Sequence, residues 1–236
     1  MKPNIIPLTI SMPFGDSENI VHPVLLWDNE SLILVDCGFR GSLPLIEKEL
    51  EKHELKVTQI TGLVLTHHDH DHMGAARALK NINPDLLVYA SEKEAPYISG
   101  QEKPLRLRQA EELQEKLPPE KQAFGKAFCE LLRSIEPVPV DIVLSDNEML
   151  RWCGGCQVLL TPGHTPGHLS LYMTEANAVL TGDAFALENN RPVIANPQFT
   201  LDMEQASKSM EKLLALDADT HYCYHGGVYS SVEGSR

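Results

Sequence analysis

The sequence predicts a mixed α/β fold in which short strands lead into helices. Runs of apolar and β-branched residues, such as 32–35 and 62–66, have the length and composition of buried strands. An amphipathic segment at 43–50 follows the first of them, with leucine and isoleucine on one face and lysine and glutamate on the other. The 236 residues suffice for one large domain or two tightly fused halves. No repeat is visible in the sequence, yet each half places strands first and a helix after them.

The N-terminal half is expected to begin with hairpins. Strands are predicted at 5–10, 24–27 and 32–35, with a turn at 28–31, and the third strand ends in Asp36-Cys37-Gly38. Ser42 is expected to cap the helix over 43–50. A strand at 62–66, a helix over 71–79 and a strand at 86–89 follow, with a break at 81–84 that contains a proline.

The middle of the chain has a different texture. Residues 100–135 are rich in Lys, Arg, Glu, Gln and Leu, and a Leu117-Pro118-Pro119 break divides them. This pattern predicts two helices joined by a proline turn, inserted as a cap rather than as a core layer. Its nearly balanced charges leave two interpretations open, a solvated helical pair or a substrate-recognition element.

The β pattern resumes after this segment. Strands are predicted at 142–144 and 157–161, with Trp152 to Cys156 as a two-residue hairpin between strands. Further strands are expected at 169–173 and 178–180, then a helix over 203–216 and a strand over 221–224.

The composition excludes several classes of partner. A formal net charge of −13, from 20 basic and 33 acidic residues, argues against binding nucleic acid. No apolar run reaches 18 residues and the N-terminus lacks a signal-peptide pattern, so we expect no membrane association and a cytoplasmic location. Five scattered cysteines do not form a disulfide framework. A small-molecule substrate is expected, and a homodimer stays open.

Six consecutive metal-capable residues follow the strand at 62–66. They are four histidines and two aspartates, His67-His68-Asp69-His70-Asp71-His72. Packed together at low dielectric they would suffer desolvation and mutual repulsion unless a bound cation reversed the local electrostatics. The alternative, a solvated loop, explains this density less well, so the segment predicts a metal site.

Other predicted strand ends carry further candidate ligands. His164, Asp183 and His225 each lie where a strand ends, and glycines nearby allow the chain to turn there. A mononuclear zinc site needs three or four ligands, and this set offers seven or more. Two divalent ions that share one carboxylate fit the number better.

With these motifs in place, the sequence resembles the metallo-β-lactamase superfamily, in particular its glyoxalase II-like and lactonase-like hydrolases. Five segments match in order: Asp36-Cys37-Gly38, the histidine-rich run to Gly74, Thr161 to His168, Thr181-Gly182-Asp183, and His225-Gly226. The resemblance implies a four-layer αββα sandwich with metals at the edge where two sheets meet. It implies one domain of this fold over 1–236, with a helical insertion at about 100–135.

The resemblance also implies a ligand set. The first metal would take His67, Asp69 and His164, and the second would take Asp71, His72 and His225, with Asp183 between them. The family usually has a histidine where this chain has Asp69, so the alternative is that His68 or His70 ligates instead. Zinc is the first expectation, and a carboxylate ligand shifts the preference toward iron or manganese.

The remaining candidates have plainer interpretations. We expect His168 to fix the loop that holds His164, and Asp36 to be a hydrogen-bond partner of the histidine-rich segment. His22, His53 and His221 are expected to have no role in the site. The Cys153 and Cys156 pair has no second pair to complete a zinc site. Tyr222 or Tyr224 could donate to a substrate, although at least one is expected to pack in the core.

The implied activity is hydrolysis by a metal-bridged hydroxide. Asp71 and Asp183 would keep the nucleophile oriented while a metal polarises the carbonyl oxygen. A small ester, thioester or lactone is favoured as the substrate, because the acidic chain has no basic arm for nucleic acid. The alternatives are an iron-based oxidoreductase on the same scaffold and a phosphodiesterase.

Overall fold

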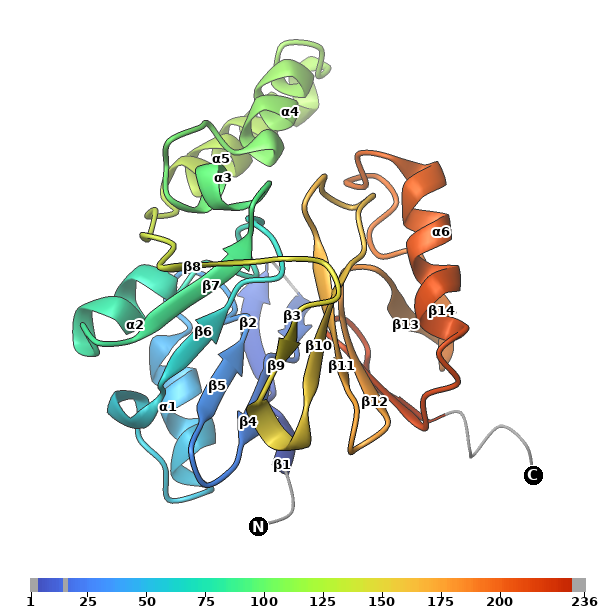
Figure 1. Ribbon diagram of the computed structural model, residues 1–236. Coiled ribbons are helices and arrows are strands. Elements are labelled where there is room, and N and C mark those ends of the chain that lie inside the picture. The colour runs from blue at the N-terminus through green and yellow to red at the C-terminus, as the bar shows by residue number, and fades with distance from the viewer. Residues whose placement is uncertain (1–3, 15–16, 231–236) are drawn as a thin grey trace.

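Two six-stranded sheets pack against each other, with helices on both outer surfaces (Figure 1). The computed structural model describes residues 4–14 and 17–230. The helices α1 (Leu43–Glu51) and α2 (Ala76–Ile82) cover one side, and α6 (Met203–Leu214) covers the other. This arrangement confirms the predicted four-layer αββα sandwich.

The first sheet has the strand order β1-β4-β5-β6-β7-β8. Its strands are β1 (Asn4–Pro7), β4 (Val24–Trp27), β5 (Leu32–Val35), β6 (Gly62–Val64), β7 (Leu87–Ser91) and β8 (Ile142–Leu144). Strands β5 to β8 run parallel, and β4 is antiparallel to both of its neighbours. A short 3-10 turn, η1 (Val57–Gln59), precedes β6.

The second sheet has the order β16-β15-β12-β11-β10-β9. Its strands are β9 (Met149–Leu150), β10 (Cys156–Leu160), β11 (Leu169–Met173), β12 (Ala178–Gly182), β15 (Thr220–Cys223) and β16 (Gly227–Ser230). Strands β12 and β15 are parallel, and the other pairs are antiparallel. Two separate hairpins pair β2 (Ile10–Phe14) with β3 (Ser17–Val21) and β13 (Ala186–Glu188) with β14 (Arg191–Val193).

Alternation of side chains along the first sheet explains why it is covered on both faces. Leu25 and Leu34 lie opposite each other and belong to the core cluster that includes Ile46 of α1. Their neighbours Leu26 and Ile33 point the other way, into the core between the two sheets. Each such side chain contributes about 1.5–3 kcal/mol through burial, so both faces need a covering layer.

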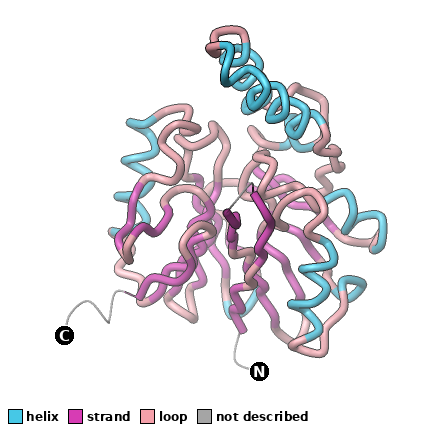
Figure 2. The backbone as a smooth tube through the Cα atoms, turned by 180° about the vertical axis from the view of Figure 1, so that it is seen from behind, coloured by secondary structure: helices cyan, strands magenta, loops and turns pink. Residues whose placement is uncertain are grey.

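The inserted segment forms two helices that project beyond the sandwich (Figures 1 and 2). After α3 (Ala95–Ile98), the chain forms α4 (Leu105–Gln114), the 3-10 turn η2 (Pro119–Lys121) and α5 (Gln122–Arg133). A small cluster of Leu107, Ala110, Cys129 and Leu132 joins α4 to α5. This segment, residues 100–135, is called the insert below.

The N-terminal region and one hairpin differ from the sequence prediction. The run at 5–10 is not one strand, because β1 ends at Pro7, which has no N–H to donate, and Ile10 begins a separate hairpin. The hairpin between β9 and β10 has a longer loop than predicted. It contains the 3-10 turn η3 (Trp152–Gly154), in which Cys153 has a φ of 48°.

The helix predicted over 71–79 begins instead at Ala76 and ends at Ile82. The preceding residues bond elsewhere: Cys37 N donates to His72 O at 2.8 Å, and Gly74 N donates to Gly38 O at 2.9 Å. These long-range bonds hold residues 67–74, called the histidine loop below, in a non-helical turn. Ser42 does not cap α1 with its side chain, since its hydroxyl accepts from Phe39 N.

The close approach of the histidine loop to the turn at 38–40 yields a stability prediction. A Cβ at Gly74 would lie 2.3 Å from Arg40 N and 2.4 Å from Phe39 C, and these backbone atoms cannot rotate away. Gly74→Ala should therefore lower the free energy of unfolding by about 3 kcal/mol in denaturant titrations. Gly41→Ala is the control, because a Cβ there meets nothing closer than 3.9 Å and adds only strain at φ +90°, about 1 kcal/mol. Equal losses at the two positions would contradict the steric argument.

Candidate metal centre

The candidate ligands come from strand ends that meet at one edge of the sandwich. The histidine loop follows β6, and Asp183 and His225 follow β12 and β15, which are parallel. His164 follows β10, which runs in the same direction as β12 because each is antiparallel to β11. Carboxyl ends of strands at a shared edge are a usual location for a site in α/β proteins. The fold thus gathers side chains that lie far apart in the sequence.

Three side chains form a first ligand group, His67, Asp69 and His164. Asp69 Oδ2 lies 3.1 Å from His164 Nε2 and 3.6 Å from His67 Nε2. All three residues are buried. One ion could be held by these three atoms.

A second ligand group contains Asp71, His72 and His225. His225 Nε2 lies 3.4 Å from Asp71 Oδ2. The group is less enclosed than the first, since the side chain of His225 is 23% exposed and that of Asp71 is 14% exposed. The open side of the centre therefore lies at this group.

Asp183 lies between the two groups. Its Oδ1 is 3.3 Å from His72 Nε2 and 3.5 Å from His225 Nε2. Its Oδ2 is 3.4 Å from His164 Nε2. One carboxylate oxygen therefore faces each group, as a ligand shared by two ions would.

The unpaired atoms of the centre test whether divalent ions fit these residues. Within the described part of the chain, five buried ligand atoms have no hydrogen-bond partner: His67 Nε2, Asp69 Oδ1, His72 Nε2, Asp183 Oδ1 and His225 Nε2. Each such atom costs about 1–3 kcal/mol when left unsatisfied. Cations bound by the two groups would give partners to the three imidazole nitrogens and to Asp183 Oδ1, so the donor set fits divalent metal ions.

Asp36 orients the histidine loop, as the sequence predicted. His72 Nδ1 donates to Asp36 Oδ2 at 2.8 Å, and this bond orients the ring so that His72 Nε2 faces Asp183. Asp36 also accepts from Thr66 N and Thr66 Oγ1. Its φ of 58° is unusual for a residue other than glycine, and these three bonds hold it there.

His168 supports Asp183 in addition to the loop that holds His164, where Thr161 N donates to His168 O at 2.9 Å. Asp183 N donates to His168 Nε2 at 2.8 Å, so His168 Nδ1 donates to Thr161 Oγ1. One ring nitrogen therefore ties the ends of the loop that holds His164, and the other fixes the turn at Asp183. A Cβ at Gly182 would lie 2.6 Å from His168 Nε2, which explains the glycine at that position.

Charges of opposite sign stabilise one another in the centre. Burial alone would raise the pKa of Asp183, but His225, His72 and His164 hold it well below its usual range. Burial alone would lower the pKa of His72, and the carboxylates of Asp183, Asp36 and Asp71 raise it well above its usual value. Burial dominates at His168 and lowers its pKa well below 6.5, which keeps that ring neutral.

The structure brings Asp69, and neither His68 nor His70, into the first group. His68 Nδ1 donates to Glu94 Oε2, and its Nε2 accepts from Leu105 N at 3.2 Å. His70 lies edge-on to Phe39 and Phe128, with its Nδ1 3.4 Å from Asp71 Oδ1. His68 and His70, which were the alternative ligands, therefore make their contacts outside the first group.

The sequence interpretation missed two residues next to the centre. Glu94 is fully buried, and besides His68 it accepts from Thr165 Oγ1 and Gly167 N, so it links the two ligand loops. Glu94 lies shortly after the end of β7, and a carboxylate at the end of a strand is the sequence signal that could have identified it. Arg106 of α4 forms an ion pair with Asp69. No sequence signal marked Arg106, because only tertiary packing places the insert.

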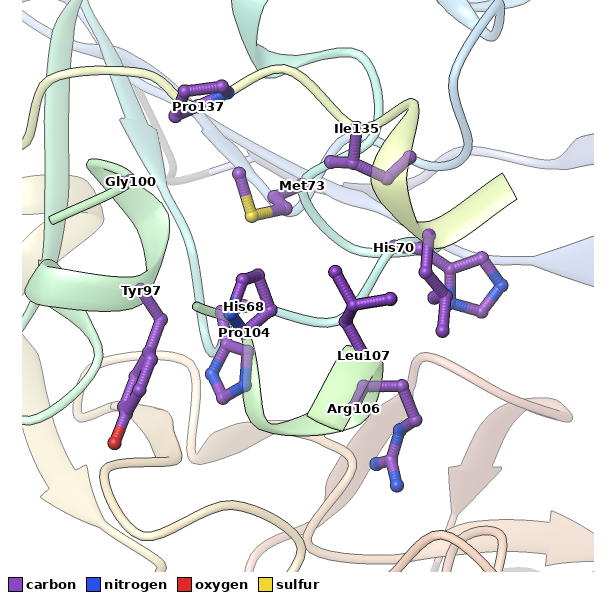
Figure 3. Close-up of a pocket in the computed structure, with 11 residues that line it drawn as sticks. His68, His70, Met73, Tyr97, Gly100, Pro104, Arg106, Leu107, Ile135 and Pro137 are labelled. Carbon is purple, nitrogen blue, oxygen red and sulfur yellow. The ribbon is translucent and has the colours of Figure 1, made fainter. Parts of the chain in front are cut away.

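A mostly apolar pocket lies between the histidine loop and the insert (Figure 3). His68, His70 and Met73 line it from the loop side, and Arg106 and Leu107 line it from α4. Its other lining residues are Tyr97, Gly100, Pro104, Leu132, Ile135 and Pro137. The pocket adjoins the centre through His70 and Arg106, which contact Asp71 and Asp69.

Several other candidates lie outside the ligand groups. Tyr224 is buried, and its hydroxyl donates to Asp71 O and accepts from Gly38 N, so it supports the histidine loop. Tyr222 packs against the core between the sheets. His221 packs between the rings of Phe185 and Tyr229.

His22 and His53 are partly buried rather than fully exposed. His22 Nδ1 donates to Leu8 O at 3.1 Å, which ties the β2–β3 hairpin to its flanking chain. Neither residue belongs to a ligand group among residues 4–14 and 17–230.

The family comparison agrees with the fold and the strand-end residues. The family model described as "Metallo-beta-lactamase superfamily" matches residues 17–225. The chain belongs to the metallo-beta-lactamase superfamily. The match includes each of the seven candidate ligands.

Curated relatives of this superfamily member include metallo-hydrolases. The probable metallo-hydrolase YflN of Bacillus subtilis (strain 168) is 29% identical over 209 residues, which cover 83% of this chain and 75% of the relative. The probable metallo-hydrolase YqjP of the same organism is 26% identical over 242 residues, covering 98% of this chain and 74% of the relative. A hydroxyacylglutathione hydrolase of Ectopseudomonas mendocina (strain ymp) is 35% identical over 101 residues, covering 41% of this chain and 37% of the relative.

Solved structures share the fold of this superfamily member. The metallo-beta-lactamase family protein TTHA1429 from Thermus thermophilus superposes with a TM-score of 0.74 at 24% identity, covering 98% of this chain and 76% of that chain. TTHA1623 in a di-iron-bound form gives a TM-score of 0.66 at 23% identity, covering 98% of this chain and 97% of that chain. No helix among the described residues has the length and apolar character needed to cross a membrane.

The cysteines yield a prediction that does not depend on metal. All five are free and buried, and burial raises the pKa of Cys153 to about 11 and that of Cys156 to about 12. The thiolate fraction at neutral pH falls accordingly, so we expect native protein to react with a thiol reagent about 100-fold more slowly than denatured protein. Mass spectrometry of labelled peptides checks this, with the denatured chain as control. Rapid native labelling of either residue would instead indicate a reactive pair.

Proposed function

We propose that this protein is a metal-dependent hydrolase that uses two divalent ions to cleave a small ester, thioester or lactone. The observation that carries the proposal is the position of Asp183, whose two oxygens face two separate ligand groups. The named relatives that are metallo-hydrolases support the reaction class.

Each group would hold one ion. His67, Asp69 and His164 would bind the first, and Asp71, His72 and His225 would bind the second. Zinc is our first choice, and the carboxylate of Asp69 makes iron or manganese an alternative. When bound, the ions would supply an acidified water for attack and would polarise the substrate carbonyl.

The chain's own residues would orient the reactants. Asp71 and Asp183 offer carboxylate oxygens that can accept a hydrogen bond from the attacking water. The Tyr224 hydroxyl fixes the backbone at Asp71, and His168 fixes the backbone at Asp183, so both carboxylates are held in place by buried partners. Because neutral His168 has both ring nitrogens engaged, we assign it to positioning rather than proton transfer.

Charge and pocket chemistry support the substrate class. The net charge of −13 disfavours polyanionic substrates such as nucleic acid. The pocket beside the histidine loop is mostly apolar and could receive the apolar part of an acyl compound. The hydroxyacylglutathione hydrolase names among the relatives also favour an acyl substrate. Five free cysteines fit a reducing compartment, which supports the cytoplasm as the location.

Metal removal and a substrate panel test the reaction class. We expect purified protein to contain close to two divalent ions per chain and to hydrolyse a lactone or thioester faster than a phosphodiester or a β-lactam. Removing the ions with a chelator should abolish turnover, and adding zinc, manganese or iron(II) should restore it. Undiminished hydrolysis by metal-free protein would refute the proposal. Fastest turnover of the phosphodiester, or oxygen consumption with an iron-loaded sample, would favour the rival activities.

Asp183→Asn tests the shared ligand. The amide offers one weaker donor oxygen and no charge, so we expect turnover and metal affinity each to fall by about 100-fold or more while the protein stays folded. Turnover, metal content and circular dichroism provide the readouts. Asp85→Asn is the matched control, since Asp85 is exposed at the turn before β7. Normal turnover in Asp183→Asn would reject the role of the shared carboxylate.

A further inference from the structure

The insert hydrogen-bonds to the histidine loop through two consecutive residues at the start of α4, and Phe128 of α5 lies edge-on to His70 of the loop. Leu105 N donates to His68 Nε2 at 3.2 Å. Arg106 Nη2 and Nε both donate to Asp69 Oδ2, at 2.6 Å and 3.2 Å. The second contact is with a member of the first ligand group, so the insert directly meets the metal centre.

The guanidinium of Arg106 has protein partners on every side. Its Nη1 donates to Phe199 O and to Gln109 Oε1, each at 2.6 Å, and its Cζ lies 4.8 Å from the centre of the Phe199 ring. The side chain is only 4% exposed. A buried guanidinium with its donors engaged cannot serve as a receptor for an anionic substrate without breaking these bonds.

The same guanidinium reaches the support of a second ligand. Phe199 precedes Thr200, whose hydroxyl lies 3.4 Å from His164 Nδ1, and Leu201 N donates to His164 O at 3.2 Å. Arg106 Nη2 also lies 3.5 Å from His164 Nε2. Arg106 therefore fixes Asp69 directly and the segment that orients His164 indirectly.

We propose that Arg106 is a positioning residue for the first ligand group, so that ion binding by His67, Asp69 and His164 depends on the insert. The inference rests on the proposed function, because it assumes that this group binds an ion. The second group makes no contact with Arg106 among the bonds and ion pairs of the described residues, so its ion should not depend on Arg106.

Charge gives the pair a second property. Asp69 brings one negative charge that a neutral histidine would not bring, and Arg106 supplies one positive charge beside it. The two residues are therefore matched: the guanidinium suits a carboxylate ligand and would repel an incoming cation if that ligand were neutral.

The first experiment measures zinc and manganese(II) binding to the metal-free full chain by competition with a chromophoric chelator. The affinity of each ion is measured in a variant that lacks a ligand of the other group. His225→Ala impairs the second group, and His164→Ala impairs the first. In His225→Ala, Arg106→Met should weaken the remaining ion by about 10- to 100-fold. In His164→Ala, Arg106→Met should change the remaining ion's affinity by less than about twofold.

Controls separate positioning from a general loss of structure. Arg108→Met removes an exposed arginine on the same helix, whose ion pair with Glu102 spans 3.5 Å, and should leave both ions unchanged. Arg106→Lys keeps the charge without the fork and should give an intermediate affinity. Circular dichroism and thermal unfolding show whether each variant is folded. Equal weakening of both ions by Arg106→Met, or tighter binding of the first ion, would overturn the inference.

A double variant tests the matched charges. Asp69→His alone should weaken the first ion, because Arg106 then faces the cation without its carboxylate. The double variant with Asp69→His and Arg106→Met should bind that ion more tightly than Asp69→His alone. If the two substitutions instead weaken binding additively, the match is overturned. If the wild-type chain binds fewer than two ions, the proposed two-ion function fails at that step. A wild-type chain with two ions and an unaffected Arg106→Met variant would refute this inference alone.

Discussion

The structure depends on burying carboxylates beside imidazoles at the edge where the two sheets meet. Asp36, Asp69 and Asp183 are each at most 5% exposed, and an isolated buried carboxylate would destabilise the fold strongly. Opposite charges compensate them: His72 lies between Asp36 and Asp183, and Arg106 lies against Asp69. The fold can therefore keep a concentrated set of ligand atoms away from bulk water, which is the condition for strong electrostatic effects on a substrate.

The histidine loop is held by residues from four other segments, which bond to its backbone or to its side chains. Asp36 follows β5, Glu94 follows β7, Tyr224 follows β15 and Arg106 comes from the insert, and each contacts the loop. Within the loop, the backbone bonds of His72 N and Met73 N to Asp69 O form a turn that does not continue as a helix. The consequence is a loop whose side chains at 67, 69, 71 and 72 converge rather than spreading around a helix axis.

The insert contributes directly to the centre. It forms one wall of the apolar pocket, and it places a cation on a carboxylate that stands where the superfamily's usual motif has a histidine. The cation lies at the start of α4, where Leu105 and Arg106 contact the loop, and the pocket wall also includes Leu132 of α5. The far ends of α4 and α5 project away from the sandwich, with Leu113 and Phe124 exposed, whereas Phe128 of α5 lies edge-on to His70. The insert therefore meets the centre along the parts of both helices that face the histidine loop.

The sequence by itself determined the layers and the ligand types. Leu25 and Leu26 are neighbours in one strand, so their side chains point to opposite faces and each face needs its own covering layer. Histidines and aspartates at strand ends predict a metal site. Both signals depend only on neighbours in the chain. Tertiary structure alone decided that Asp69 rather than His68 joins the first group, that His168 bonds to Asp183 N, and that Arg106 meets Asp69. It also made α2 begin at Ala76 rather than at residue 71. Those outcomes depend on contacts between residues far apart in the sequence, such as His68 with Glu94 and Cys37 with His72, and no local propensity encodes such pairings.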